Sequence, residues 1–207
     1  MLFNLGGPDR PEAVQPFLFN LFNDPAIIGI PQPFRWLLAN LISRRRAPVA
    51  REIYDHIGGR SPLLELTEAQ AEALERRLND TADAGSHFRV LIAMRYWHPM
   101  SDETAITAAE FEPDQVVLLP LYPQFSTTTT GSSVKDWDRA ARAAGLSVPT
   151  RTICCYPTVP AFVTAHADAV RDALAPHAGA RPRLLFSAHG LPMKVIDAGD
   201  PDRKSVV

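Results

Sequence analysis

A histidine follows a short apolar run in the last part of the chain. Leu184–Phe186 is followed by the small residues Ser187 and Ala188, and His189 then precedes a glycine. In open α/β sheets, ligands bind beyond the carboxyl ends of the strands. A histidine at such a position can donate a proton, accept one or bind a metal near neutral pH. From position alone, the alternative is a loop histidine held by a backbone carbonyl.

The residues that follow the other predicted strands share one chemical character. They are mostly apolar or aromatic, with one arginine and a histidine, and they include no carboxylate: Leu5–Gly7, Arg95–Pro99 and Tyr122–Ser126. If the strands are parallel, these residues and His189 meet at one edge of the sheet. Such a lining suits a large, flat, mostly apolar ligand. A guanidinium group there would bind acidic substituents of that ligand.

Other motifs support rival functions less well. The run Ser126–Ser133 could cradle an anion at a helix N-terminus, but it lacks the lysine of a phosphate-binding loop, and capping explains it as well. Ser187 and His189 lie two residues apart on one strand end, which disfavours a hydrolase pair. His98 and His189 could share a metal, but no third ligand is evident.

The order of predicted elements indicates an α/β fold. Apolar strands alternate with helices of 10–15 residues, which is typical of right-handed crossovers and a parallel, doubly wound sheet. The predicted strands are Met1–Leu5, Phe88–Met94, Gln115–Leu121, Thr150–Cys155 and Arg183–Ser187. The predicted helices are Pro11–Phe22, Phe34–Arg45, Pro48–Ile57, one capped by Thr67, Asp102–Glu110, Ser132–Ala144 and Val159–Ala175.

Composition excludes several classes of protein. The 207 residues are 46% hydrophobic and 21% charged, with a net charge of −2, which gives no reason to expect nucleic acid as a partner. Two adjacent cysteines, Cys154 and Cys155, lie in an apolar run, so we predict core thiols in a reduced, cytoplasmic protein. The apolar stretch Pro16–Ile42 is interrupted by charges and prolines, which favours a partly exposed lip over a membrane span.

Seven blocks, in order along the chain, resemble the ferrochelatase family, whose members insert ferrous iron into a porphyrin. The blocks are Asn4–Pro8, Arg45–Pro48, Tyr54–Pro62, Arg95–Pro99, Tyr122–Ser126 with Thr129–Ser133, Phe186–Met193 and Gly199–Pro201. The resemblance implies two Rossmann-like domains with the porphyrin between them. We therefore expect a complete first domain over residues 1–150 and a partial second domain over residues 151–207.

The resemblance also implies roles for individual residues. His189 matches the active-site histidine, assigned in the family to proton abstraction, metal binding or both. Leu5, Arg95, Tyr96 and Tyr122 match the cleft wall beside the macrocycle, and Arg46, Tyr54 and Ser61 match positions that meet its propionates. The stretch Phe17–Leu41 resembles the lip that some members place against membranes.

The implied substrates are ferrous iron and protoporphyrin IX. The alternatives are another tetrapyrrole, such as coproporphyrin, or porphyrin binding without turnover by this chain alone. Thr127 stands where some members have a cysteine that binds a [2Fe–2S] cluster, so we expect no cluster in this part of the chain.

The end of the chain departs from the family pattern. Residues 202–207 match none of the blocks and resemble a translated sequencing adapter, so we expect the natural protein to be longer and those residues not to be native. The family's active-site glutamate is expected in the missing half.

Overall fold

The centre of the molecule is a four-stranded parallel sheet with the strand order β2-β1-β3-β4. The computed structural model describes residues 1–177, 179–187 and 189–201. Its strands are β1 (Leu2–Asn4), β2 (Ile92–Met94), β3 (Val116–Pro120) and β4 (Thr150–Thr152). Phe3 of β1 is in register with Ala93 on one side and with Pro120 on the other. The predicted α/β class with a parallel sheet is confirmed.

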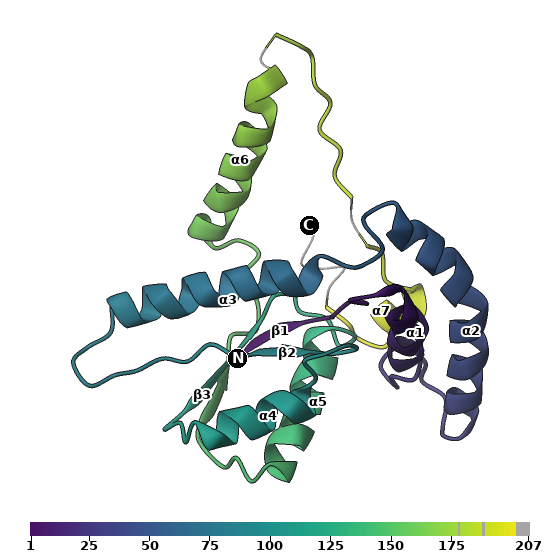
Figure 1. Cartoon of the computed structure of the whole chain (residues 1–207), viewed down its shortest axis with the longest axis horizontal. Helices are drawn as coiled ribbons and strands as arrows, with labels where there is room; N and C mark the ends of the chain where they lie inside the picture. The colour runs from purple at the N-terminus through teal and green to yellow at the C-terminus, as the bar shows by residue number, and fades with distance from the viewer. Residues whose placement is uncertain (178, 188, 202–207) are drawn as a thin grey trace.

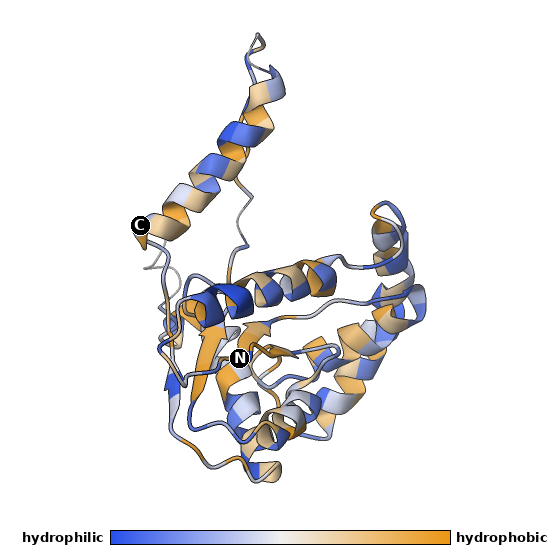
Figure 2. Cartoon of the chain, turned by 60° about the vertical axis from the view of Figure 1, so that its left-hand side comes forward, coloured by the Kyte–Doolittle hydropathy of each residue, from blue (hydrophilic) through white to orange (hydrophobic). Residues whose placement is uncertain are grey.

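Helices cover both faces of this sheet, as a doubly wound fold requires. The helical elements are η1 (Pro11–Ala13), α1 (Val14–Phe22), α2 (Phe34–Asp55), α3 (Leu63–Asp80), α4 (Ser101–Glu110), α5 (Thr130–Ala143), α6 (Pro160–Leu174), η2 (Ala175–His177) and α7 (Met193–Asp197). Figure 1 shows α3 across one face of the sheet and α4 with α5 across the other. In Figure 2 the strands are hydrophobic, whereas the outer sides of these helices are largely hydrophilic.

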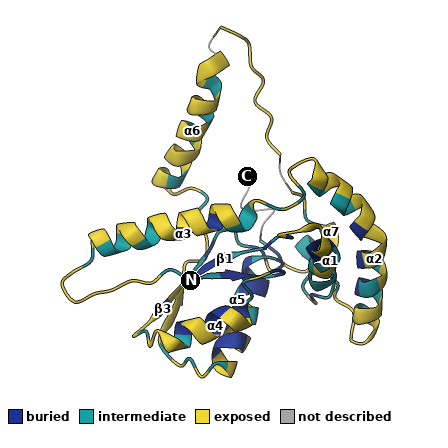
Figure 3. Cartoon of the chain, in the orientation of Figure 1, coloured by how far each residue is buried: buried dark blue, intermediate teal, exposed yellow. Residues whose placement is uncertain are grey.

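The core lies between the sheet and the pair α4 and α5. Phe3 and Trp137 are each 1% exposed, and their ring centroids are 6.0 Å apart. Buried alanines on α4 and α5, such as Ala105 and Ala140, allow the two helices to approach each other and the strands closely. Figure 3 shows that buried residues concentrate in β1, β2 and α5.

Two helix predictions were wrong in their boundaries. The predicted helices Phe34–Arg45 and Pro48–Ile57 form one helix, α2, with Pro48 inside it. The buried residues Ala39, Ser43 and Ala47 follow at intervals of four and make one continuous face, which packs against α1. Because Arg44 is exposed, water can satisfy the carbonyl group that Pro48 leaves unpaired.

Thr67 does not cap a helix. It lies inside α3, which begins at Leu63, and its hydroxyl donates to the Leu63 carbonyl at 2.6 Å. Its side chain is buried and accepts a hydrogen bond from Asn4 Nδ2 at 3.2 Å. Thr67 therefore connects α3 to the end of β1 instead of starting the helix.

The predicted strand Arg183–Ser187 was also wrong. The segment is extended but pairs with no strand among the described residues, and Leu185 and Phe186 are 80% and 89% exposed. An apolar run forms a strand only where a neighbouring strand satisfies its backbone groups. Cys154 and Cys155, predicted as core thiols, are free and exposed just after β4.

The helix α6 stands away from the sheet (Figures 1 and 3). Tyr156 precedes it and contacts the end of β3 and the residues after it. The Tyr156 amide donates to the Pro123 carbonyl at 2.9 Å, and its hydroxyl donates to the Pro120 carbonyl at 2.9 Å. The Tyr156 ring also contacts Phe162 of α6 edge to face. The domain boundary at residue 150 stays a prediction, and residues 202–207, expected not to be native, lie outside the described residues.

Candidate functional site

Four of the predicted site residues meet at one edge of the sheet. Leu5, Arg95 and Tyr122 each come shortly after a strand, β1, β2 and β3, and Tyr96 follows Arg95. The Tyr96 amide donates to the Leu5 carbonyl at 2.9 Å, and the Arg95 amide donates to the Asn4 carbonyl at the same distance. From β1 the chain goes to β2 on one side, and it then crosses to β3 on the other side of β1. A doubly wound sheet opens a ligand crevice at such a point.

A glycine pair brings Ser61 to this edge. Gly6 has φ +81°, and a Cβ atom there would lie 3.0 Å from the Trp97 amide nitrogen. A Cβ atom at Gly7 would lie 2.5 Å from the Ser61 Cβ atom, so only glycine allows this approach. The Ser61 amide donates to the Pro8 carbonyl at 2.8 Å, and its hydroxyl accepts from the Leu63 amide at 3.2 Å. The hydroxyl hydrogen remains able to donate to a ligand oxygen.

The residues predicted to meet at this edge included no carboxylate, but the structure places one there. Asp24, in the turn after α1, is 4% exposed and lies against the end of β2. Its Oδ2 atom accepts from Arg95 Nη2 at 2.8 Å, from the Tyr96 hydroxyl at 2.9 Å and from Ser132 Oγ at 2.5 Å. In the sequence, Asp24 is one charge in an apolar stretch, and nothing in its spacing indicates a partner about 70 residues away.

The two tyrosines at this edge are held in their neutral form. Burial raises the pKa of Tyr96 well above the usual range, and the neighbouring negative charge of Asp24 raises it further. Burial also raises the pKa of Tyr122, whose hydroxyl lies 3.2 Å from Ser133 Oγ. Tyr96 is 0% exposed, so the surface of this edge comes from Leu5 and Tyr122, which are partly exposed. Because Arg95 is paired with Asp24, this surface is uncharged and suits a flat apolar ligand.

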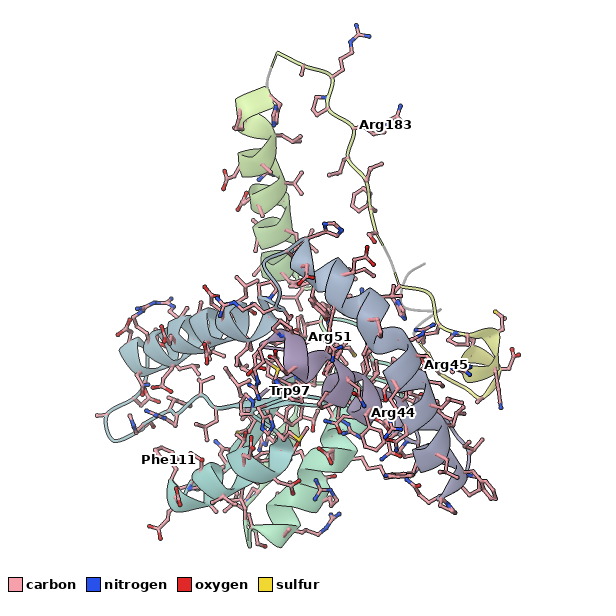
Figure 4. All side chains as sticks on the ribbon, turned by 45° about the vertical axis from the view of Figure 1, so that its right-hand side comes forward. Arg44, Arg45, Arg51, Trp97, Phe111 and Arg183 are labelled. Atoms are coloured by element: carbon pink, nitrogen blue, oxygen red, sulfur yellow. The ribbon has the colours of Figure 1, made fainter. Side chains whose placement is uncertain are left out.

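Arg46 and Tyr54 lie on α2 and not at the sheet edge. The Arg46 guanidinium lies 5.6 Å from the centre of the Phe22 ring, and no ion pair involves it within the described part of the chain. Tyr54 is half-buried, and burial raises the pKa of its phenol. Figure 4 labels three more arginines of this helix, Arg44, Arg45 and Arg51; the Arg51 Nε atom donates to the Pro11 carbonyl at 3.0 Å. A free guanidinium and a neutral phenol can both donate to a carboxylate.

The Ser126–Ser133 loop does cradle an anion, and that anion is a side chain of the same molecule. Asp200 Oδ2 accepts from Ser126 Oγ at 2.9 Å, from the Thr127 amide at 2.7 Å and from Thr127 Oγ1 at 2.5 Å. The carboxylate sits just before the N-terminus of α5, where the helix dipole favours negative charge. We call this contact the Asp200 clasp; it joins the segment after His189 to the first sheet.

His189 is exposed and lies in the extended segment between α6 and α7. Within the described residues, no hydrogen bond, ion pair or ring contact joins it to the four residues at the sheet edge. His98, the other histidine of the predicted set, pairs with Glu103 Oε1 at 2.7 Å, and the same carboxylate accepts the Met100 amide at the start of α4. His98 therefore supports a helix cap.

The site shows no metal centre among the residues that the structure describes. Over residues 1–201, apart from 178 and 188, no group of three or more His, Cys, Asp or Glu side chains is arranged to hold a metal ion. An open hollow of about 500 Å³ lies beside α5 and β4; of the residues predicted to follow the strands at the edge, Phe125 lines it. In the same part of the chain, no helix has the length and apolar content needed to span a bilayer.

The sheet and its edge define an α/β protein of the Rossmann-like, doubly wound type, with Leu5 and Tyr122 partly exposed at the switch point of the strands. Comparison with known proteins narrows this class. The family model described as ferrochelatase matches residues 1–206, and the chain belongs to this family.

Curated relatives agree with this assignment. The chain is 59% identical to a ferrochelatase of Phenylobacterium zucineum over 97% of its own length. It is 57% identical to one of Caulobacter vibrioides over 100% of its length and 49% identical to one of Pelagibacter ubique over 97%. In each case the match covers 58% of the relative, so the chain spans a little over half the length of these proteins.

Proposed function

We propose that this chain is part of a ferrochelatase that inserts Fe²⁺ into protoporphyrin IX. The observation that carries the proposal is the family match over residues 1–206 together with the uncharged wall of Leu5 and Tyr122 at the switch point of the sheet. A porphyrin is large, flat and mostly apolar, and such a wall would pack against one of its faces.

In the proposed reaction, the two pyrrole N–H bonds break, two protons leave, and the four ring nitrogens bind the Fe²⁺ ion. His189 is the proposed acceptor of these protons and a ligand that delivers the ferrous ion, because a neutral imidazole can do either near pH 7. Its exposure in this chain leaves both ring nitrogens accessible. The iron is a substrate here and not a resident cofactor.

The propionates of the porphyrin would meet Arg46, Tyr54 and Ser61. Arg46 has no acidic partner among the residues described, and Tyr54 and Ser61 each offer a hydroxyl hydrogen. We propose no [2Fe–2S] ligand in this part of the chain, because Thr127 stands where the family cysteine would be and its hydroxyl is bound to Asp200.

We further propose peripheral contact with a membrane from the cytoplasmic side. Apolar side chains of the lip are exposed on α2, with Phe34 66%, Trp36 49% and Leu37 57% exposed. Arg44 and Arg45 follow about two to three turns later. Aromatic and apolar side chains beside arginines suit the interface of a bilayer with anionic lipids. The free cysteines support a reducing compartment.

The test is metal insertion by the full-length protein with the variant His189→Ala. We expect the wild type to convert protoporphyrin to the Fe²⁺ or Zn²⁺ product and the variant to lose insertion by at least about a hundredfold, the usual contribution of a proton-transfer group. His98→Ala is the matched control, since this exposed imidazole pairs with Glu103 and contacts the Trp97 ring edge to face. Turnover retained by His189→Ala would remove the assigned role.

A second candidate function applies to the 207-residue chain by itself: porphyrin or haem binding without turnover. The observation in its favour is that the chain spans 58% of its relatives while the family cleft lies between two domains. Quenching of porphyrin fluorescence by this chain, without metal insertion, would support it. Offering coproporphyrin beside protoporphyrin to the full-length protein identifies the preferred tetrapyrrole.

A further inference from the structure

A buried carboxylate joins three parts of the molecule behind the proposed cleft wall. The Asp24 side chain is 2% exposed, and its Oδ2 atom accepts from Arg95 and Tyr96 of the loop after β2 and from Ser132 of α5. Its Oδ1 atom accepts from the Ala26 amide at 2.8 Å. Burying a carboxylate is unfavourable unless its oxygens are bonded, and this one has four donors.

The same carboxylate determines what Arg95 can do. The Arg95 side chain is 18% exposed; Asp24 lies 2.8 Å from Nη2, and Asp136 lies 3.8 Å from Nη1. Its Nε atom donates to Ser132 Oγ at 2.7 Å, and its guanidinium lies 5.0 Å from the centre of the Tyr96 ring. The positive charge of Arg95 is therefore neutralised within the protein. Arg95 therefore supports the wall from behind and does not bind acidic groups of a ligand.

Asp24 also connects Arg95 and Tyr96 to the lip. It follows the C-cap residue of α1, Asn23, in the turn that leads to the exposed apolar start of α2. A second bond runs in parallel, because Asn20 Nδ2 of α1 donates to the Tyr96 carbonyl at 3.1 Å. The two contacts tie the hairpin of α1 and α2 to the loop that carries Tyr96.

We infer that Asp24 is a positioning residue of the porphyrin cleft, which holds Arg95 and Tyr96 in place and fixes the lip against the sheet edge. The inference rests on the proposed function. Asp24 does not touch the macrocycle or the iron, so its removal weakens binding of substrate and transition state equally. Such a loss appears as a raised KM with kcat unchanged.

The experiment uses the full-length protein and the isosteric variant Asp24→Asn. The amide keeps the size of the side chain but removes its charge. It also replaces one accepting oxygen with an NH2 group, which would face groups that are themselves hydrogen-bond donors. We expect KM for porphyrin to rise about tenfold and kcat to change less than about twofold, because charge-assisted hydrogen bonds are lost without a change at the reacting atoms. A merely structural role would reduce the active fraction, which lowers kcat and leaves KM unchanged.

The matched control is Asp9→Asn. Asp9 Oδ1 accepts from Trp97 Nε1 at 3.0 Å, so it bonds the residue next to Tyr96 without touching Arg95 or Asp24. We expect this variant to keep the wild-type KM. An equal rise of KM in both variants would overturn the specific role of Asp24.

A double variant tests whether Asp24 acts through Arg95. If it does, Asp24→Asn combined with Arg95→Gln raises KM no further than the more severe single variant, because residues of one network are not additive. Additive effects would overturn the inference. A wild-type protein that neither binds porphyrin nor inserts metal would refute the proposed function itself, whereas an active wild type with an unchanged Asp24→Asn variant would refute only this inference.

Discussion

The Asp200 clasp allows a prediction about how the segment after His189 is held. Asp200 is 4% exposed, and one of its oxygens accepts three hydrogen bonds from Ser126 and Thr127. Asp200→Ala removes this acceptor. A hydrogen bond to a charged group contributes roughly 1.5–3 kcal/mol, and bonds that share one oxygen are not additive. We expect the clasp to lose about 3 kcal/mol, which corresponds to an increase of about a hundredfold in its opening equilibrium.

Amide hydrogen exchange measures this opening directly. The Thr127 amide donates to Asp200 at 2.7 Å, and the amides of Ala198 and Gly199 donate within α7 and the turn after it. All three should exchange about a hundred times faster in the variant, while the amides of β1 keep their rates, because Asp200 lies outside the core around Phe3.

Asp197→Ala is the control for the clasp. It removes an exposed carboxylate from the same short helix, and no hydrogen bond or ion pair involves that side chain within the described residues. The control should leave exchange at Thr127 unchanged. If Asp200→Ala and Asp197→Ala behave alike, the carboxylate does not hold the segment and the reasoning is refuted.

Three further predictions concern stability. Gly7→Ala should lower the free energy of unfolding by about 1–3 kcal/mol in urea, because the added methyl group meets Ser61. Gly190→Ala, which adds a methyl group in open space, should leave it unchanged. Equal effects would contradict the close packing of the turn. Trp137→Ala should lower the free energy of unfolding by about 3–5 kcal/mol, because the indole is 1% exposed in the core. Unfolding followed by circular dichroism measures this loss, and a value below about 1 kcal/mol would contradict the prediction. The raised pKa of Tyr122 means that folding favours its neutral form, so its contribution to stability is full below about pH 10 and falls as the pH rises above that value. Tyr122→Phe should therefore lessen the loss of stability at alkaline pH, measured by unfolding at a series of pH values. An unchanged profile would argue against the buried phenol.

Local patterns predicted most of the elements. The alternation of apolar strands with helices led to the parallel sheet, and β1, β2 and β3 each lie within a predicted strand. The failures occurred where a distant partner decides the structure. Leu184–Phe186 has the composition of a strand but pairs with none among the described residues, and Pro48 lies inside a helix because the buried face around Ala47 continues through it.

The sequence by itself determined the class of the sheet, the family and the residue types that follow each strand, because these depend on local composition and order. Only the tertiary structure showed that Asp24 neutralises Arg95 and that Asp200 fills the anion cradle before α5. These pairs are separated by about 70 residues in the chain, and no local pattern encodes such a contact. A buried carboxylate needs donors wherever the fold supplies them, and their identity depends on which strand ends and helix termini the fold brings together.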